Sequence, residues 1–179
     1  MKKKLLLSAL GLLLTASLAH AQLGTTTGTT TVSVAVAAEA ALTAITGTST
    51  LTSVGTNFSK YTGTTSLTYF IRTTPTSGSG TITLEVTTDF APTGGPSVGS
   101  PPTAGDALTY NCTVSSPGTA CTGPLTASKS AWTSVGTFGA DNHSTFAGNS
   151  ASVAWSLTND PLYKVGTYTA TVTFTISAS

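Results

Sequence analysis

The sequence is short of charge, of aromatic residues and of cysteine. Lys, Arg, Asp and Glu together supply 7% of its 179 residues, the aromatic residues another 7%, and there are two cysteines. A disordered polyelectrolyte, a coiled coil and a helical bundle all need far more charge. A nucleic-acid-binding protein needs a basic face against the phosphates. These classes are therefore disfavoured.

The charge that is present is nearly balanced. Three lysines fall in the first four residues, and residues 22–179 hold four cations and six carboxylates, a formal charge of −2. We expect no nucleic-acid partner from this distribution. The cations are Lys60, Arg72, Lys129 and Lys164, and the acids are Glu39, Glu85, Asp89, Asp106, Asp141 and Asp160.

Residues 1–21 have the pattern of a signal peptide. A basic start, Met1–Lys4, precedes an apolar stretch, Leu5–Leu18, and Ala19-His20-Ala21 fits the small-x-small cleavage rule. The apolar stretch is shorter than the roughly 20 residues of a membrane-spanning helix, which favours cleavage before Gln22 over an uncleaved anchor. We expect a secreted, periplasmic or cell-surface protein with no membrane span after the leader is removed.

The two cysteines fit an exported protein. Cys112 and Cys121 are separated by small and polar residues, with a Pro117-Gly118 turn between them. An oxidising compartment favours a disulfide, whereas the spacing is not C-x-x-C and no second pair completes a zinc site. The sequence therefore predicts a structural disulfide, with no metal and no cofactor.

Hydroxyl side chains dominate the composition: 40 Thr and 22 Ser account for 62 of the 179 residues. Threonine favours strands and keeps an exported sheet soluble without charge. Apolar residues alternate with the hydroxyls along short segments that Gly and Pro turns separate. The predicted strands are residues 31–37, 51–54, 66–72, 81–87, 107–114, 131–138, 152–157 and 167–177.

These segments predict an all-β protein, an antiparallel Ig-like or pilin-like β-sandwich of about eight strands. A flexible N-terminal segment, residues 22–30, would precede a single sandwich domain, residues 31–179. No fixed-period repeat of the solenoid kind is visible.

Three local features refine this prediction. The segments 66–72 and 81–87 look like the two arms of a hairpin. Alanine-rich Val36–Ala44 is a candidate helical turn. Residues 91–106, with four prolines, are expected to form a long surface loop.

Groups that could carry catalysis are scarce after the leader. His143 is the one histidine there, no G-x-S-x-G motif is present, and a solvated loop histidine is the simpler interpretation. Ordinary surface placement explains Glu85 and Asp89 better than a glycosidase pair does. Asp106 and Asp141 lack the D-x-D series of a calcium loop. We expect no catalytic residue and no enzyme.

Arg72 closes its predicted strand on the face opposite Leu67, Tyr69 and Ile71. Its guanidinium suits a carboxylate ligand held in a bidentate fork. A surface ion pair with an acid such as Glu85 on the neighbouring strand is the favoured interpretation.

Three further features suggest binding surfaces. Alternate threonines of segment 167–177 form a row that resembles ice-binding surfaces, although no repeated coil extends it. Trp132 and Tyr163 are candidate glycan contacts, because aromatic rings can stack on sugars. Trp155 shares a face with Leu157 and is expected in the core.

The third feature is a candidate strand donor. Val32, Val34 and Val36 lie on one face of the segment 31–37, which follows a loose stretch of chain. A free alternating strand can complete a neighbour's sheet. Pairing within its own domain is the more common arrangement for a sequential strand.

The C-terminal stretch resembles two families of bacterial surface proteins. Trp155-Ser-Leu157 matches the W-x-L motif of WxL cell-surface domains. Tyr168–Ile176 resembles their second motif, Y-x-x-x-L-T-W-x-L, with Val172, Phe174 and Ile176 in place of Leu, Trp and Leu. This resemblance implies binding to bacterial cell walls.

Gly166-Thr-Tyr168, followed by alternating Val and Thr, is also similar to the last strand of spore-coat-U-like and chaperone–usher pilin subunits. In those families an N-terminal extension donates a strand to the next subunit, which would make Val32, Val34 and Val36 the donor residues. The cysteine pair departs from the pilin arrangement, which ties an early strand to a later one.

We therefore expect a non-enzymatic, exported structural or adhesive subunit that assembles with itself or with related surface subunits by β-strand addition. The alternative is a cell-wall or polysaccharide binding module of the WxL type, in which exposed aromatic residues bind glycan.

Overall fold

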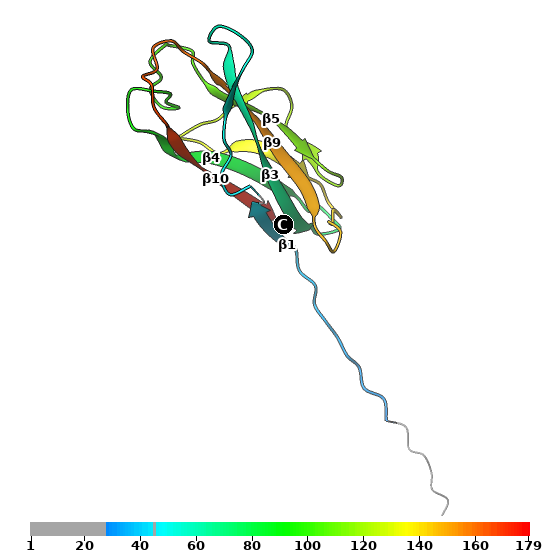
Figure 1. Ribbon diagram of the computed structural model, residues 1–179. Coiled ribbons are helices and arrows are strands. Elements are labelled where there is room, and N and C mark those ends of the chain that lie inside the picture. The colour runs from blue at the N-terminus through cyan, green and yellow to red at the C-terminus, as the bar shows by residue number, and fades with distance from the viewer. Residues whose placement is uncertain (1–27, 45) are drawn as a thin grey trace, which may run out of the picture. The chain divides into compact units, whose positions relative to one another are not determined.

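The computed structural model describes residues 28–44 and 46–179 (Figure 1). The predicted signal peptide and residues 22–27 of the N-terminal segment lie outside the described residues. Residues 35–179 form one compact unit. The described residues contain ten strands and no helix, which confirms the all-β prediction.

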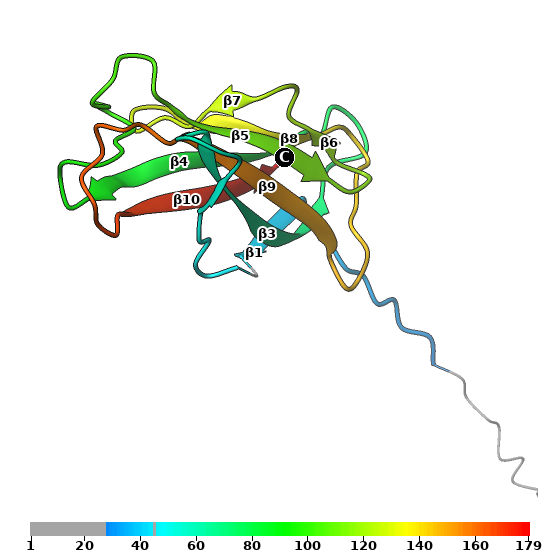
Figure 2. The same cartoon turned by 45° about the horizontal axis from the view of Figure 1, so that its top comes forward.

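The strands form two antiparallel sheets that pack face to face as a sandwich (Figure 2). Sheet A contains β1 (Glu39–Ala44), β2 (Thr52–Val54), β3 (Lys60–Arg72), β5 (Leu108–Val114), β7 (Leu125–Thr126) and β9 (Asn149–Thr158). Sheet B contains β4 (Gly80–Ala91), β6 (Thr119–Ala120), β8 (Thr133–Phe138) and β10 (Thr169–Ala178). The strand order is β1-β3-β9-β5-β7 in sheet A, with β2 paired to β3, and β10-β4-β8-β6 in sheet B.

Period-two alternation places one face of each long strand in the core. Leu67 and Tyr69 of β3 are fully buried from sheet A, and Ile82 and Leu84 of β4 from sheet B. Burying a large apolar side chain contributes about 1.5–3 kcal/mol, so this shared core holds the two sheets together. The opposite faces carry mostly hydroxyls, and one cross-strand row of sheet A is Thr62, Ser156, Thr109 and Thr126.

The expected hairpin between segments 66–72 and 81–87 is wrong. β3 belongs to sheet A and β4 to sheet B. The loop 73–79 therefore carries the chain from one sheet to the other. The apolar faces of the two strands meet across the sandwich, and this burial replaces the edge-to-edge pairing that a hairpin would have.

The first strand begins later than predicted. Residues 31–37 are in no strand, and β1 takes up the alternation at Glu39, which pairs with Arg72 at the end of β3. β3 offers no ladder position beyond Arg72, so residues upstream of Glu39 have no β3 partner. Val36–Ala44 contains this strand rather than a helical turn, because pairing with β3 and burial of Leu42 outweigh the helix propensity of alanine.

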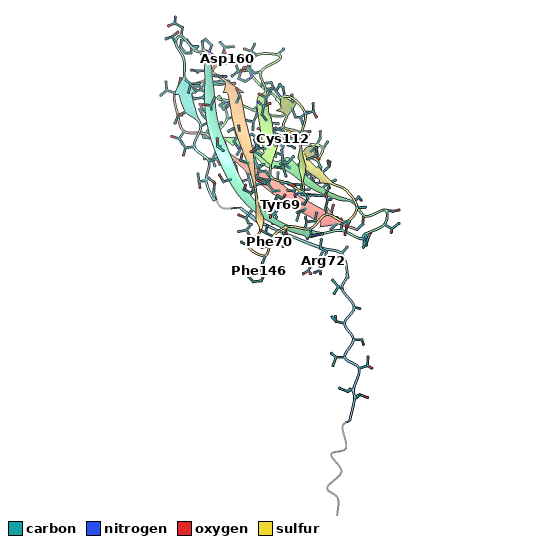
Figure 3. The ribbon with its side chains drawn as sticks, turned by 90° about the vertical axis from the view of Figure 1, so that its right-hand side faces the viewer. Tyr69, Phe70, Arg72, Cys112, Phe146 and Asp160 are labelled. Atoms are coloured by element: carbon teal, nitrogen blue, oxygen red, sulfur yellow. A yellow bond between two sulfur atoms is a disulfide. The ribbon has the colours of Figure 1, made fainter. Side chains whose placement is uncertain are left out.

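Loops gather at the two ends of the sandwich, called here the Arg72 pole and the Asp160 pole. Figure 3 shows Arg72 and Phe146 at one end and Asp160 at the other. The Arg72 pole is formed by loops 73–79, 115–118 and 139–148, and the Asp160 pole by loops 55–59, 92–107, 127–132 and 159–168.

A buried hydrogen bond between an indole and a hydroxyl group of sheet A provides a test of the core. Trp155 Nε1 donates to Thr65 Oγ1 at 2.8 Å. We expect Thr65→Val to lower the free energy of unfolding by about 1–3 kcal/mol, because the indole N–H would remain buried without an acceptor. Chemical denaturation measures this change. The control is Thr64→Val on the exposed face of β3, and equal midpoints for the two variants would contradict the prediction.

Candidate functional site

The two sides of the sandwich are closed differently. On one side the edge strands are β1 of sheet A and β10 of sheet B, which lie near each other (Figure 2). Among the described strands, β1 pairs only with β3, and β10 pairs only with β4. Each strand therefore has one edge whose backbone N–H and C=O groups are outside any ladder. We call this side the open edge.

The core is incompletely covered along the open edge. Val172, Phe174 and Ile176 of β10 pack against the core but are only partly buried, as is Leu42 of β1. By contrast, Leu84 on the adjacent strand β4 is fully buried. A further strand placed along this edge would bury these side chains more completely.

The candidate donor valines are exposed. Val32, Val34 and Val36 are 90%, 85% and 63% exposed. Residues 28–37 are all exposed, and residues 28–38 contain no strand or helix. The segment thus offers a row of apolar side chains at strand spacing.

Arg72 fixes the residues that lead into β1. Its Nε donates to the C=O of Ala37 at 2.8 Å, and its Nη2 lies 3.0 Å from Glu39 Oε2. The expected surface ion pair is confirmed, but its acid is Glu39 and not the suggested Glu85, which lies on β4 in the other sheet. His143 forms an isolated β-bridge with Arg72 and is exposed, as expected of a loop histidine. The ion pair is itself exposed, so its role is positional more than energetic.

The opposite side of the sandwich is closed by the disulfide. Cys112 lies in β5 of sheet A and Cys121 directly follows β6 of sheet B, and the two are bonded. The predicted pairing is confirmed, and it links the two sheets. The edge strands on this side, β6 and β7, have two residues each. A long added strand therefore fits the open edge better than this one.

Tyr163, one candidate glycan contact, is tied to a carboxylate. Its hydroxyl donates to Asp106 Oδ2 at 3.1 Å, and burial together with the Asp106 charge raises the pKa of Tyr163. Asp160 accepts hydrogen bonds from the Thr103 hydroxyl and the Leu162 N–H, which lower its pKa. Burial, with the neighbouring Asp160, raises the pKa of Asp106. These bonds hold the loops of the Asp160 pole together.

Trp132, the other candidate glycan contact, is 49% exposed. It lies just before β8 and two residues beyond Ser130, which lines an open depression of about 580 Å³. Asp106 and Asp141 lie at opposite poles. Within residues 28–44 and 46–179, no three His, Cys, Asp or Glu side chains gather as metal ligands would. The depression is lined by Val98, Gly99, Thr126, Ala127, Ser128, Lys129 and Ser130.

The residues of the C-terminal motif lie inside the sandwich or along its open edge. Trp155 and Leu157 are each 5% exposed, as expected of core residues. Phe174 faces the partly covered core. Tyr168 precedes β10, and its hydroxyl donates to the C=O of Lys164 at 2.7 Å. No large part of this motif is free to stack on a ligand.

Sequence analysis did not foresee the role of Asp89. Its carboxylate accepts hydrogen bonds from Ser97 Oγ at 2.7 Å, Val98 N–H at 2.7 Å, Gly99 N–H at 3.1 Å and Phe90 N–H at 2.8 Å. Burial alone would raise the pKa of Asp89, but these donors outweigh it and lower the pKa. The available signal was an acid at the end of a strand, followed by a loop rich in Ser and Gly.

Comparison of the chain with family models, with curated protein sequences and with solved structures finds no match. The class is therefore defined by the fold itself: an all-β sandwich with one disulfide-linked side and one open edge. No helix long and apolar enough to cross a membrane occurs in the described part of the chain.

The Asp89 hydrogen bonds predict a pH-dependent stability. Because the folded pKa lies below the unfolded value of about 3.9, the stabilisation is present above that value and is lost as pH falls through the folded pKa. We expect Asp89→Asn to destabilise the protein by about 1 kcal/mol at pH 7, since water screens a partly exposed carboxylate. The difference should shrink as the pH falls through the folded pKa of Asp89.

Thermal unfolding from pH 2 to pH 7 tests this expectation. The control is Glu85→Gln on the outer face of sheet B, for which we expect no comparable loss of stability. A deficit in Asp89→Asn that is the same at every pH would contradict the prediction.

Proposed function

We propose that this protein is a non-enzymatic, exported surface subunit that assembles by β-strand addition. The N-terminal segment of one copy pairs with the open edge of another copy or of a related subunit. The observation that carries this proposal is the presence, in one chain, of an exposed alternating strand segment and a partly uncovered sheet edge.

The donor segment supplies the apolar face that the open edge lacks. Val32, Val34 and Val36 recur every second residue, so they point to one side of an extended chain. Placed on β10, they would cover Val172 and Phe174. Each fully buried valine contributes roughly 1.5 kcal/mol or more, and backbone hydrogen bonds to β10 add to the affinity.

The lengths of the donor and the acceptor match. Residues 28–36 span about 30 Å when extended at roughly 3.3 Å per residue, and β10 has ten residues. All described strand pairs in both sheets are antiparallel. We therefore assign the added strand an antiparallel direction to β10, which continues the pattern of sheet B.

The edge of β10 carries little protection against pairing. Native edge strands are usually guarded by lysine, proline or inward charge. Thr169–Ala178 contains no charged residue and no proline. Its pairing with β4 is irregular only around Thr171, where the register shifts on both sides of that residue. A long edge strand without charged residues or proline is expected in a protein whose edge pairs with another chain.

The resemblance of the C-terminal strand to spore-coat-U-like and pilin subunits supports the same proposal, as does the leader-like N-terminus. We assign the Ig-like or pilin-like character of the sandwich on the same grounds. Export places the subunit in the periplasm, on the cell surface or outside the cell, where the disulfide persists.

A cell-wall or polysaccharide binding module is the second candidate. The half-exposed Trp132, close in sequence to the depression that Lys129 and Ser130 line, supports it. An exposed aromatic ring offers a flat apolar face on which a sugar ring can stack. Pull-down with purified wall polysaccharide tests this candidate, and Trp132→Ala should abolish retention.

The assembly proposal is tested by the mass of the mature protein in solution and by electron microscopy. We expect oligomer ladders or filaments for the unmodified chain. Val34→Asp should weaken assembly at least 100-fold, because it would bury a carboxylate without a partner. Ser33→Asp places the same charge on the opposite face of the segment, and we expect it to assemble.

Two results would contradict the proposal. One is a monomeric unmodified chain at all concentrations. The other is equal assembly of Val34→Asp and Ser33→Asp, since strand addition requires the two faces of the segment to differ. Circular dichroism of both variants confirms that the sandwich itself is intact.

A further inference from the structure

The sandwich exposes large apolar side chains mainly at its two poles. Phe146 at the Arg72 pole is fully exposed, and Phe58, Leu162 and Val165 at the Asp160 pole are 61%, 65% and 107% exposed. Trp132, which is 49% exposed, lies in loop 127–132 at the Asp160 pole. The outer faces of the sheets carry hydroxyls instead. Large apolar side chains are therefore exposed at the two ends of the sandwich and are scarce on the outer faces of its sheets.

Phe146 is held in place by a hydrogen-bonded turn. Thr145 Oγ1 donates to the C=O of Gly148 at 2.7 Å, and Gly148 N–H donates to the C=O of Thr145 at 3.0 Å. Thr145 N–H also donates to Asn149 Oδ1 at 2.9 Å. Gly148 has a φ of +80°, and a Cβ there would lie 2.8 Å from the ring of Phe70. The turn thus fixes the backbone that carries the exposed Phe146 side chain, which lowers the cost of ordering this loop in an interface.

Phe58 is presented by a strained turn. Its φ is +55°, and that of Asn57 before it is +54°. Asparagine tolerates this left-handed conformation, whereas a bulky aromatic residue adopts it rarely and at a cost. The conformation keeps most of the Phe58 ring in solvent. Strain that maintains an exposed aromatic side chain indicates a binding role for it.

The direction of strand addition decides which poles meet. β10 begins at the Asp160 pole and ends at the Arg72 pole, and the donor segment joins β1 at the Arg72 pole. An antiparallel donor on β10 runs toward the Asp160 pole of the acceptor. Its last residues, 36–38, therefore arrive there together with the Arg72 pole of the donor copy.

We propose that neighbouring copies also make a pole-to-pole contact, in which Phe146 of one copy docks against Phe58, Leu162 and Val165 of the next. This inference rests on the proposed strand addition and its antiparallel direction. The occupant is a second copy of this chain, in head-to-tail orientation. Such a contact joins two different surfaces and therefore repeats from copy to copy, as a linear filament requires.

A photo-crosslinking amino acid tests this contact in the full mature chain. p-Benzoylphenylalanine at position 146 keeps an aromatic side chain in place. Mass spectrometry of the crosslinked oligomers should locate the crosslinks in residues 55–59 or 161–166 of another copy. The same amino acid at position 154 is the matched control, because Ala154 is exposed in the middle of β9, on the outer face of sheet A and away from both poles, and it should not crosslink to those residues.

The outcomes separate this inference from the proposed function. Oligomers that form without crosslinks from position 146 to the Asp160 pole overturn the pole contact and leave strand addition intact. Adding Val34→Asp should lower the crosslink yield at least tenfold, because the poles alone bind weakly. Undiminished crosslinks in that variant would uphold the contact and overturn strand addition. A chain that never associates overturns both.

Discussion

The ladder between β1 and β3 ends where β3 ends, at Arg72, and the arrangement of the N-terminus depends on this limit. Glu39 takes the last ladder position. The alternation of apolar residues continues upstream through Val36, Val34 and Val32, but β3 has no backbone left to pair with them. A strand segment therefore exists in the sequence without a place in its own sheet.

The two sides of the sandwich, where the edge strands of the sheets lie, are closed in different ways. A covalent bond from Cys112 to Cys121 links the sheets where their edge strands are shortest. On the other side, β1 and β10 approach each other without covering the core between them. Since an unpaired edge can pair with further strands, this asymmetry restricts the proposed strand addition to one side of the sandwich.

Much of the fold could be predicted from the sequence, because alternation reports which face of a strand is buried. Alternation correctly predicted the inward faces of β4, β9 and β10. The disulfide was predicted from the presence of two cysteines in a chain expected to be exported to an oxidising compartment. Alternation does not say which strands pair. For that reason the prediction of a hairpin between 66–72 and 81–87 was wrong. The suggested acid partner of Arg72 was wrong for the same reason, since Arg72 pairs with Glu39 and not with Glu85.

The candidate site was predictable only in part, for a related reason. The donor valines are visible in the sequence as a local pattern, whereas the open edge is a property of two strands from opposite ends of the chain. The hydrogen bonds of Asp89 likewise join β4 to a loop whose path no periodicity fixes.

The scarcity of charge connects these features. A sandwich with outer faces of Thr and Ser stays hydrated without charged residues, so neither flat side attracts a partner strongly. Yet an uncharged edge such as β10 also lacks the usual protection against pairing. In the proposed assembly, association is therefore restricted to the edge and to the poles. An exposed edge of this kind risks indiscriminate aggregation, and a donor segment of matching length on every copy would direct that tendency into ordered assembly.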